Sequence, residues 1–154
     1  MKAVVHVGLP KTGTTSIQRF LRANAAALAA RGAVYTRVPN GRVPPQDSQL
    51  EYGICALAIA GDVVPNRATR AAYGLDDLAA AGEFAARYME AVQEDVRAHR
   101  GAELYLVSSE HLGAWRRTPA HLEALDGWLG SLFCGVRSVL YVRRQEDRIL
   151  SLYS

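Results

Sequence analysis

The start of the chain carries the feature that most constrains its fold: a short apolar segment that runs into a glycine-rich turn and then into a helical pattern. Residues 3–7 are rich in valine and stop at the Gly-Leu-Pro of residues 8–10, which predicts a buried strand. Residues 14–31 carry apolar side chains on one stripe and are followed by Gly32, which predicts a helix. Such a turn presents backbone N–H groups at the positive end of a helix dipole, so it favours an anion.

The rest of the chain repeats the alternation of strands and helices. Apolar segments predict three more strands, at residues 33–36, 103–108 and 137–142. Loops are expected at residues 38–47 and 62–74. Apolar periodicity, with caps at Asp76 and Thr118, predicts further helices at residues 48–60, 77–100, 119–133 and from 146 onward. This pattern predicts a three-layer α/β fold with a doubly wound parallel sheet, in one domain over residues 1–154, that is incomplete at its C-terminus.

Arginine supplies almost all of the positive charge. Of the 18 Lys and Arg residues only Lys2 and Lys11 are lysines, and 15 acidic residues leave a net charge of +3. No long basic block occurs, so we expect no nucleic-acid partner. The apolar run before Gly8 is too short for a signal peptide or a membrane span, and Cys55 and Cys134 have no metal-ligand or redox spacing. We therefore expect a cytoplasmic protein with two reduced thiols.

The turn at residues 8–15 differs from the loop of nucleotide triphosphatases in the place of its lysine. That loop has a glycine, four residues, a second glycine, a lysine and a Ser or Thr. Here Gly8 and Gly13 have this spacing, but Thr14 stands in place of the lysine and Lys11 lies inside the loop. A lysine at this position would act on a shorter, diphosphate-like group, so we expect no metal ion.

Residues 9–16, Leu-Pro-Lys-Thr-Gly-Thr-Thr-Ser, resemble the 5′-phosphosulfate loop of the sulfotransferase family, bacterial members included. The resemblance implies a P-loop-like nucleotide-binding topology and the donor 3′-phosphoadenosine 5′-phosphosulfate. It implies that Lys11 stabilises charge on the bridging oxygen as the sulfuryl group leaves. It also implies a set of donor-binding residues: Pro10, Lys11, Thr12, Gly13, Thr14, Thr15 and Ser16.

A second motif follows the predicted strand at residues 137–142. Arg143 stands at the end of that strand, and Ser151 follows eight residues later in the next predicted helix. Ligands of parallel α/β sheets bind outside the carboxyl ends of the strands, which is where Arg143 would lie. This spacing resembles the family's 3′-phosphate site, which implies that Arg143 and Ser151 hold the 3′-phosphate of the donor. The alternative is that Arg143 only forms surface ion pairs with Glu146 and Asp147.

Two candidate catalytic bases follow the predicted strand at residues 103–108. Transfer to a hydroxyl needs a group that removes the acceptor proton, and Glu110 and His111 both stand at the carboxyl end of this strand. Adjacent residues on an extended chain point in opposite directions, so we expect only one of the two to face the donor. A resemblance of residues 108–110 to bacterial sulfotransferases slightly favours Glu110. In the alternative, both residues only cap a loop or lie on the surface.

The functional hypothesis is therefore a sulfotransferase that acts on a hydroxyl or amine acceptor of unknown class. Residues 37–75 are expected to shape the acceptor side of the cleft. Two rival hypotheses remain open, a P-loop small-molecule kinase and a non-catalytic nucleotide-binding fragment of the same fold. Of the other histidines, we expect His6 in the core and His99 and His121 on the surface.

Overall fold

Within the part of the chain that the structure describes, four strands form one sheet in which all neighbours are parallel. The computed structural model describes residues 1–44, 46–115 and 118–152. The strands are β1 (Lys2–Val7), β2 (Ala33–Val34), β3 (Leu104–Ser109) and β4 (Val136–Leu140), in the order β2-β3-β1-β4. In this register His6 lies beside Ser108 on one side and beside Val139 on the other. The expected α/β class with a parallel sheet is confirmed.

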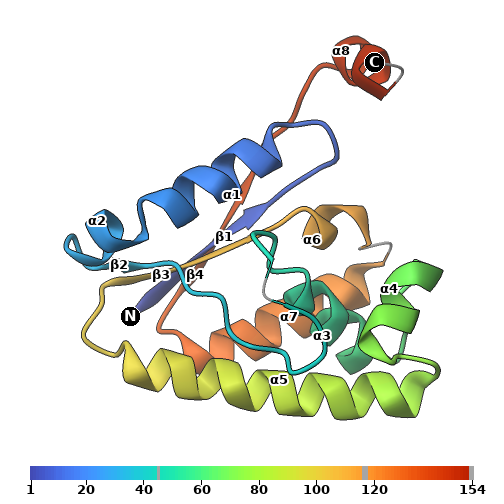
Figure 1. The fold of residues 1–154 in the computed structure, drawn as a ribbon, viewed down its shortest axis with the longest axis horizontal. Coiled ribbons are helices and arrows are strands. Elements are labelled where there is room, and N and C mark those ends of the chain that lie inside the picture. Colours follow the sequence, from blue (N-terminus) through green and yellow to red (C-terminus); the bar gives the residue numbers. More distant parts are fainter. Residues whose placement is uncertain (45, 116–117, 153–154) are drawn as a thin grey trace.

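Helices cover both faces of this sheet. In Figure 1, α1 and α2 lie on one face, α3, α5 and α7 lie on the other, and α8 stands apart from the rest of the fold. The helices of the described residues are α1 (Thr14–Ala23), α2 (Ala25–Ala29), α3 (Glu51–Ile59), α4 (Arg67–Tyr73), α5 (Leu78–Ala98), α6 (His111–Ala114), α7 (Pro119–Leu132) and α8 (Gln145–Leu152). None of them is long and apolar enough to cross a membrane.

The core lies between the sheet and the layer formed by α3, α5 and α7. Helix α3 is buried over most of its length, and Tyr52, Ile54 and Cys55 have no exposed surface. The Tyr52 ring stacks on Trp128 of α7, with 5.2 Å between the ring centroids. Burial of these side chains contributes to the hydrophobic stabilisation of the fold.

The boundaries of several elements differ from the sequence prediction. The helix predicted at residues 14–31 is divided at Asn24 into α1 and α2. The side-chain amide of Asn24 donates to the Phe20 carbonyl. Helix α5 is capped by Asp77 rather than Asp76, because the Asp77 carboxylate accepts from the Ala80 N–H at 2.8 Å. Residues 62–74, predicted as a loop, contain α4.

Helix α4 has its own start and stop residues. The Asn66 side chain accepts a hydrogen bond from the Thr69 N–H at 3.0 Å, and Gly74 ends the helix in the left-handed region with φ of +65°. Such short helices are hard to predict, because seven residues give less than two full turns of apolar periodicity.

Candidate functional site

The turn after β1 is held in one conformation by hydrogen bonds within it. The Thr12 hydroxyl donates to the Leu9 carbonyl at 2.7 Å, and Gly13 adopts φ of +83°, which favours glycine. Lys11 also has a positive φ, 65°, which is uncommon for a residue with a side chain. The carbonyl of Gly13 accepts from the amides of Ser16 and Ile17 as α1 begins. The amides of the first helical residues, Thr14 and Thr15, have no acceptor within the helix, so they are available to an anion.

Two glycines let this turn pack directly against the end of β3 and against α6. A Cβ atom at Gly8 would lie 2.5 Å from the Thr14 methyl group and 2.9 Å from the Glu110 Cα. A Cβ atom at Gly113, in α6, would collide with the Gly8 carbonyl oxygen. Side chains at either position would separate the turn from Glu110. Gly113 was not among the predicted site residues, because no helix was predicted at residues 111–114 and its contact with Gly8 arises only in the folded chain.

One pocket brings the three predicted motifs together. It has a volume of about 450 Å³ and lies beyond the carboxyl ends of β1, β3 and β4. Its lining comes from four separate segments of the chain: Pro10, Lys11, Gly13, Thr14, Thr15, Glu110, Arg143 and Ser151. Of the remaining predicted site residues, Thr12 is bonded within the turn, Ser16 lies on the exposed side of α1, and His111 is not part of the lining.

Glu110 and His111 lie in different surroundings. Glu110 stands immediately before α6 and lines the pocket. The His111 ring packs on Trp115, with 4.4 Å between centroids, and its Nδ1 lies 3.5 Å from the Ser48 hydroxyl. Burial lowers the pKa of His111 below the ordinary value, so its neutral form is favoured. The geometry therefore gives Glu110, and not His111, access to a ligand in the pocket.

A cluster of buried polar side chains surrounds Ser108, two residues before Glu110 on β3. The Ser108 hydroxyl lies 2.8 Å from the Nδ1 of His6, and its N–H donates to the Oε1 of Gln49 at 2.6 Å. The Gln18 side chain of α1 approaches the Ser108 carbonyl at 3.4 Å. Ser108, Gln18, Gln49 and His6 are all buried, and burial lowers the pKa of His6. His6 is thus the core histidine that the sequence predicts, while Gln18 and Gln49 were not predicted as site residues.

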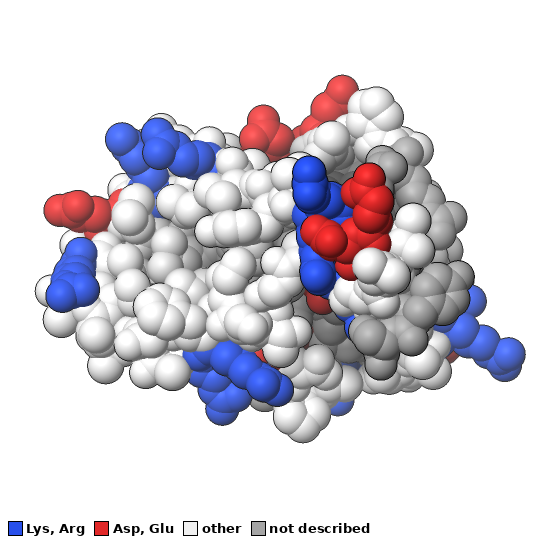
Figure 2. Space-filling model, turned by 90° about the horizontal axis from the view of Figure 1, so that it is seen from above, with Lys and Arg blue, Asp and Glu red and all other residues white. Residues whose placement is uncertain are grey.

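Arg143 reaches from the end of β4 to the turn. Its guanidinium donates to the Lys11 carbonyl at 3.2 Å. Within the described residues it forms no ion pair with Glu146 or Asp147, which was the alternative reading of this motif. Seen from above, Lys and Arg side chains stand in separate groups, one of them directly beside acidic side chains (Figure 2). Among the described residues of this face, the basic side chains therefore do not form a continuous surface of the kind that binds a nucleic-acid backbone.

His121 differs from its prediction. It is 3% exposed, and its Nε2 lies 3.3 Å from a carboxylate oxygen of Asp62, just beyond α3. The expected surface position was wrong, because the face of α7 that carries His121 turns toward the protein interior. His99 is half-buried at the end of α5, where its Nδ1 lies 2.8 Å from the Asp95 carbonyl.

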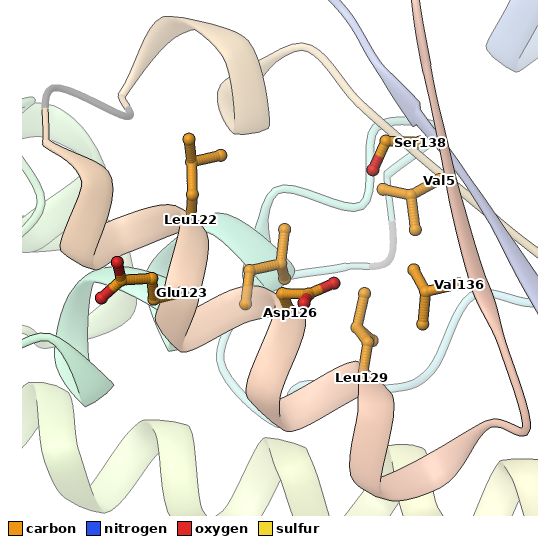
Figure 3. Close-up of a pocket in the computed structure, with 8 residues that line it drawn as sticks. Val5, Leu122, Glu123, Asp126, Leu129, Val136 and Ser138 are labelled. Atoms are coloured by element: carbon orange, nitrogen blue, oxygen red, sulfur yellow. The ribbon is translucent and has the colours of Figure 1, made fainter.

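A second pocket, of about 280 Å³, opens between α7 and the strands β1 and β4 (Figure 3). Its charged side chains, Glu123 and Asp126, are acidic, so they would repel an anionic ligand. The other lining residues are mostly apolar: Val5, Leu122, Leu125, Leu129, Val136 and Ser138. None of the predicted site residues belongs to this pocket.

Comparisons with family models, with curated proteins and with solved structures give no match to this chain. Among the residues that the structure describes, no group of three or more His, Cys, Asp or Glu side chains could hold a metal ion. What the site can do follows from its own groups: amides at a helix N-terminus, the cations Lys11 and Arg143, and one carboxylate, Glu110. Such a set can hold an anion at two points and accept a proton between them.

Proposed function

We propose that this protein binds 3′-phosphoadenosine 5′-phosphosulfate in the 450 Å³ pocket and transfers its sulfuryl group to a hydroxyl acceptor. The observation that carries the proposal is the meeting of Lys11, Glu110 and Arg143 in one pocket, although they stand far apart in the sequence. The pocket volume falls within the range of roughly 300–1,000 Å³ that small-molecule sites occupy. The proposal joins this geometry to the resemblance of residues 9–16 and 143–151 to sulfotransferases.

The fold supports the donor-binding half of the proposal. The strand order β2-β3-β1-β4 puts the turn at the end of an inner strand, as a P-loop-like topology requires. The 5′-phosphosulfate would bind the amides of Thr14 and Thr15 and the ammonium group of Lys11. The 3′-phosphate would bind Arg143 through a charge-assisted bond and Ser151 through its hydroxyl. The donor carries these two anionic groups at opposite ends of one ribose, and the pocket offers one cationic side chain for each, Lys11 and Arg143.

The chemical step would be an in-line transfer between two oxygen atoms. The acceptor hydroxyl attacks the sulfur, the bond from sulfur to the bridging phosphate oxygen breaks, and the leaving 5′-phosphate keeps the electron pair. Lys11 would stabilise the charge that develops on that oxygen. Glu110 would take the proton of the acceptor hydroxyl, since it lines the pocket whereas His111 packs on Trp115.

Calorimetry with two nucleotides tests the proposal against the kinase hypothesis. The donor becomes 3′-phosphoadenosine 5′-phosphate, the donor product, once its sulfuryl group has been transferred. We expect this nucleotide to bind equally well with and without magnesium. A kinase would instead bind ATP, and would need magnesium to do so. Preferential, magnesium-dependent binding of ATP would overturn the proposal.

A screen of hydroxyl acceptors with labelled donor tests the transfer step itself. We expect labelled sulfate to appear on at least one acceptor, with release of the 3′-phosphorylated product. Binding of that product without transfer to any acceptor would instead favour a non-catalytic nucleotide-binding module.

A further inference from the structure

Gln49 is the buried residue that connects the segment after β2 to the end of β3. It is 2% exposed, although it lies outside any helix or strand. Its backbone N–H donates to the Ser108 carbonyl at 3.1 Å, and its side-chain oxygen accepts from the Ser108 N–H at 2.6 Å. Its side-chain nitrogen donates to the Thr36 carbonyl at 2.7 Å. The main chain and the side chain of Gln49 thus bind both the carbonyl and the N–H of Ser108.

These bonds occupy the place where β2 would have continued. Strand β2 pairs with β3 only through Ala33 and Val34, which lie beside Leu104 and Tyr105. Beyond that point the backbone groups on this side of β3 need other partners, because an unpaired buried amide is costly. Gln49 provides both partners at Ser108. On the other side of β3, the next carbonyl, that of Ser109, accepts from the Gly8 N–H at 3.0 Å.

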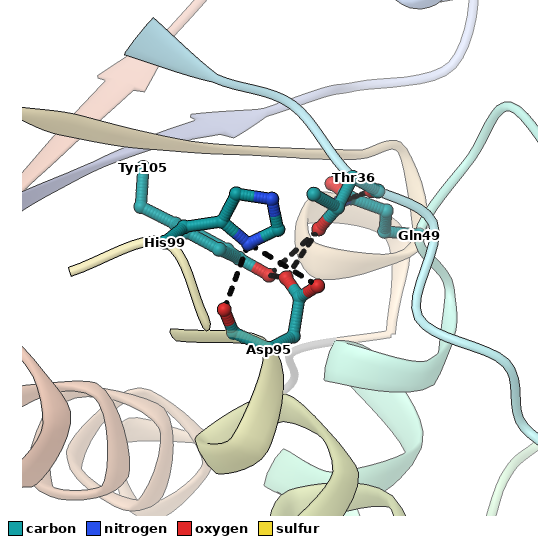
Figure 4. Close-up of polar contacts among 5 residues, drawn as sticks. All are labelled: Thr36, Gln49, Asp95, His99 and Tyr105. Atoms are coloured by element: carbon teal, nitrogen blue, oxygen red, sulfur yellow. Dashed lines mark hydrogen bonds and ion pairs between the residues drawn. The ribbon is translucent and has the colours of Figure 1, made fainter. Parts of the chain in front are cut away.

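The far end of the Gln49 side chain is itself fixed to the start of β3. The Thr36 hydroxyl donates to the Asp95 carboxylate at 2.7 Å, and the Tyr105 hydroxyl donates to the same carboxylate at 2.6 Å. Figure 4 shows these contacts converging on Asp95, with Gln49 on the other side of Thr36. Gln49 therefore bridges two points of β3, one at Tyr105 and one at Ser108. The span between Thr36 and Gln49 forms a loop whose two ends are both anchored on that strand.

We propose that Gln49 is a positioning residue that holds the end of β3, and with it the Glu110 carboxylate, against the Lys11 turn. This inference rests on the proposed function, because it assigns Gln49 a part in placing the base of that reaction. Ser108 precedes Glu110 by two residues, and Ser108 and Ser109 are bonded on opposite sides of the strand. Release of the Ser108 side would let Glu110 shift relative to Lys11. The same hydrogen bonds connect the strand that carries Glu110, the proposed base, to residues 37–75, which are predicted to shape the acceptor side of the cleft.

The test compares two substitutions of Gln49 with a control on the surface. Gln49→Met keeps the length of the side chain and removes both of its hydrogen bonds. Gln49→Glu keeps the oxygen that accepts from the Ser108 N–H. Gln93→Met changes an exposed glutamine of α5 and serves as the control. For each protein we would measure kcat for sulfuryl transfer, the Kd of 3′-phosphoadenosine 5′-phosphate, and amide hydrogen exchange at Ser108 and Glu110.

We expect Gln49→Met to lower kcat by roughly 10- to 100-fold, as a displacement of about 1 Å in a catalytic group can do. The Kd of the donor product should not change, because the Lys11 turn and Arg143 are untouched. Gln49→Glu should recover only part of kcat, because it keeps the bond from the Ser108 N–H but places an oxygen against the Thr36 carbonyl, and Gln93→Met should match the wild-type protein. The amides of Ser108 and Glu110 should lose protection in Gln49→Met while the protection of β1 is kept.

Two results would overturn the role of Gln49. One is wild-type kcat in Gln49→Met. The other is a parallel loss of kcat and donor-product affinity, with protection lost over the whole sheet, since that describes general unfolding. A wild-type protein that neither binds the donor product nor transfers sulfate would count against the proposed function instead. In that case the hydrogen exchange of the Ser108 amide still tests whether Gln49 holds the end of β3. Unchanged exchange in Gln49→Met would overturn this role, and faster exchange confined to this amide and that of Glu110 would support it.

Discussion

The pocket has an inner wall, made of residues 10–15 and Glu110, and an outer wall, made of Arg143 and Ser151. The inner wall follows the ends of β1 and β3, where His6 and Ser108 are buried, and Gly8 and Gly113 bring its segments into direct backbone contact. The outer wall follows β4, most of which is exposed, and Val142 next to Arg143 is 75% exposed. The two walls meet where Arg143 donates to the Lys11 carbonyl.

This difference separates two properties that substitutions can report. Buried contacts behind the inner wall are coupled to the stability of the fold, because changes there disturb buried hydrogen bonds and close packing, whereas the side chain of Lys11 is exposed. On the outer wall the Arg143 side chain is exposed, so we expect its substitution to act mainly on the ligand. Substitutions that disturb the buried contacts of the inner wall should therefore change the melting temperature, whereas substitutions of the exposed side chains, Lys11 and Arg143, should change only kcat or the affinity.

The largest effect is expected from Lys11→Ala, which removes the cation that would stabilise the leaving oxygen. We expect kcat for sulfuryl transfer to fall by roughly 100- to 1,000-fold, the usual loss on removing such a group. The melting temperature should stay unchanged, because the Lys11 side chain is exposed and alanine keeps a Cβ at the same positive φ. Arg144→Ala, which removes a nearby exposed cation, is the matched control. Transfer at a near wild-type rate would contradict the assigned role of Lys11.

Arg143→Ala should act on affinity alone. We expect the Kd of 3′-phosphoadenosine 5′-phosphate to rise by roughly 10- to 100-fold, through loss of a charge-assisted hydrogen bond worth about 1.5–3 kcal/mol. Calorimetry measures this change, and Arg144→Ala again controls for net charge. Adenosine 5′-phosphate lacks the 3′-phosphate, so its Kd should not respond. An equal loss of affinity for both nucleotides would show that Arg143 does not read the 3′-phosphate.

Gly113→Ala should act on stability, as expected for the inner wall. The added methyl group would meet the Gly8 carbonyl, so α6 and the turn must move apart. We expect the free energy of unfolding to decrease by about 1–3 kcal/mol, measured by urea denaturation. Gly82→Ala is the control, because a Cβ there meets nothing within 4 Å and alanine favours the interior of α5. Equal stability of the two variants would remove the argument that backbone contact shapes this wall.

The smallest effect is a pH dependence of stability that comes from two histidines close in sequence to the inner wall, His6 before the turn and His111 after Glu110. Burial lowers the pKa of His6 and of His111 below 6.5, so unfolding allows both side chains to bind protons more readily. Their stabilising contribution is complete above about pH 6.5 and is lost as the pH falls through the folded-state pKa. We expect the urea midpoint to fall between about pH 7.5 and about pH 5.5. His111→Gln should reduce this fall, and an unchanged fall would exclude a contribution from His111.

The turn could be predicted from the sequence because its determinants are local. Glycine spacing, a preceding apolar strand and a following helix all lie within residues 3–31. The second motif was predictable for a similar reason, since Arg143 directly follows an apolar strand and strand ends meet at one edge of a parallel sheet. The α/β class followed from the alternation of elements along the chain.

Other parts of the site depend on contacts that no local pattern encodes. The different surroundings of Glu110 and His111 come from α6, which starts at His111 and whose His111 ring packs on Trp115. Gln49 lies 59 residues from Ser108 in the sequence, and nothing in its neighbourhood indicates that its side chain replaces a strand. The contact between Gly113 and Gly8 likewise arises only when α6 packs on the turn.

The left-handed backbone at Lys11 has a consequence for selection experiments. A lysine at φ of 65° carries a conformational cost that glycine avoids and asparagine reduces. A library randomised at this position and sorted for thermal resistance alone should therefore enrich glycine and asparagine. The same library sorted for retention on an immobilised 3′,5′-bisphosphorylated adenosine should enrich lysine. The difference between the residues enriched at position 11 in the two sorted libraries would measure how far ligand binding opposes the conformational preference of the backbone there.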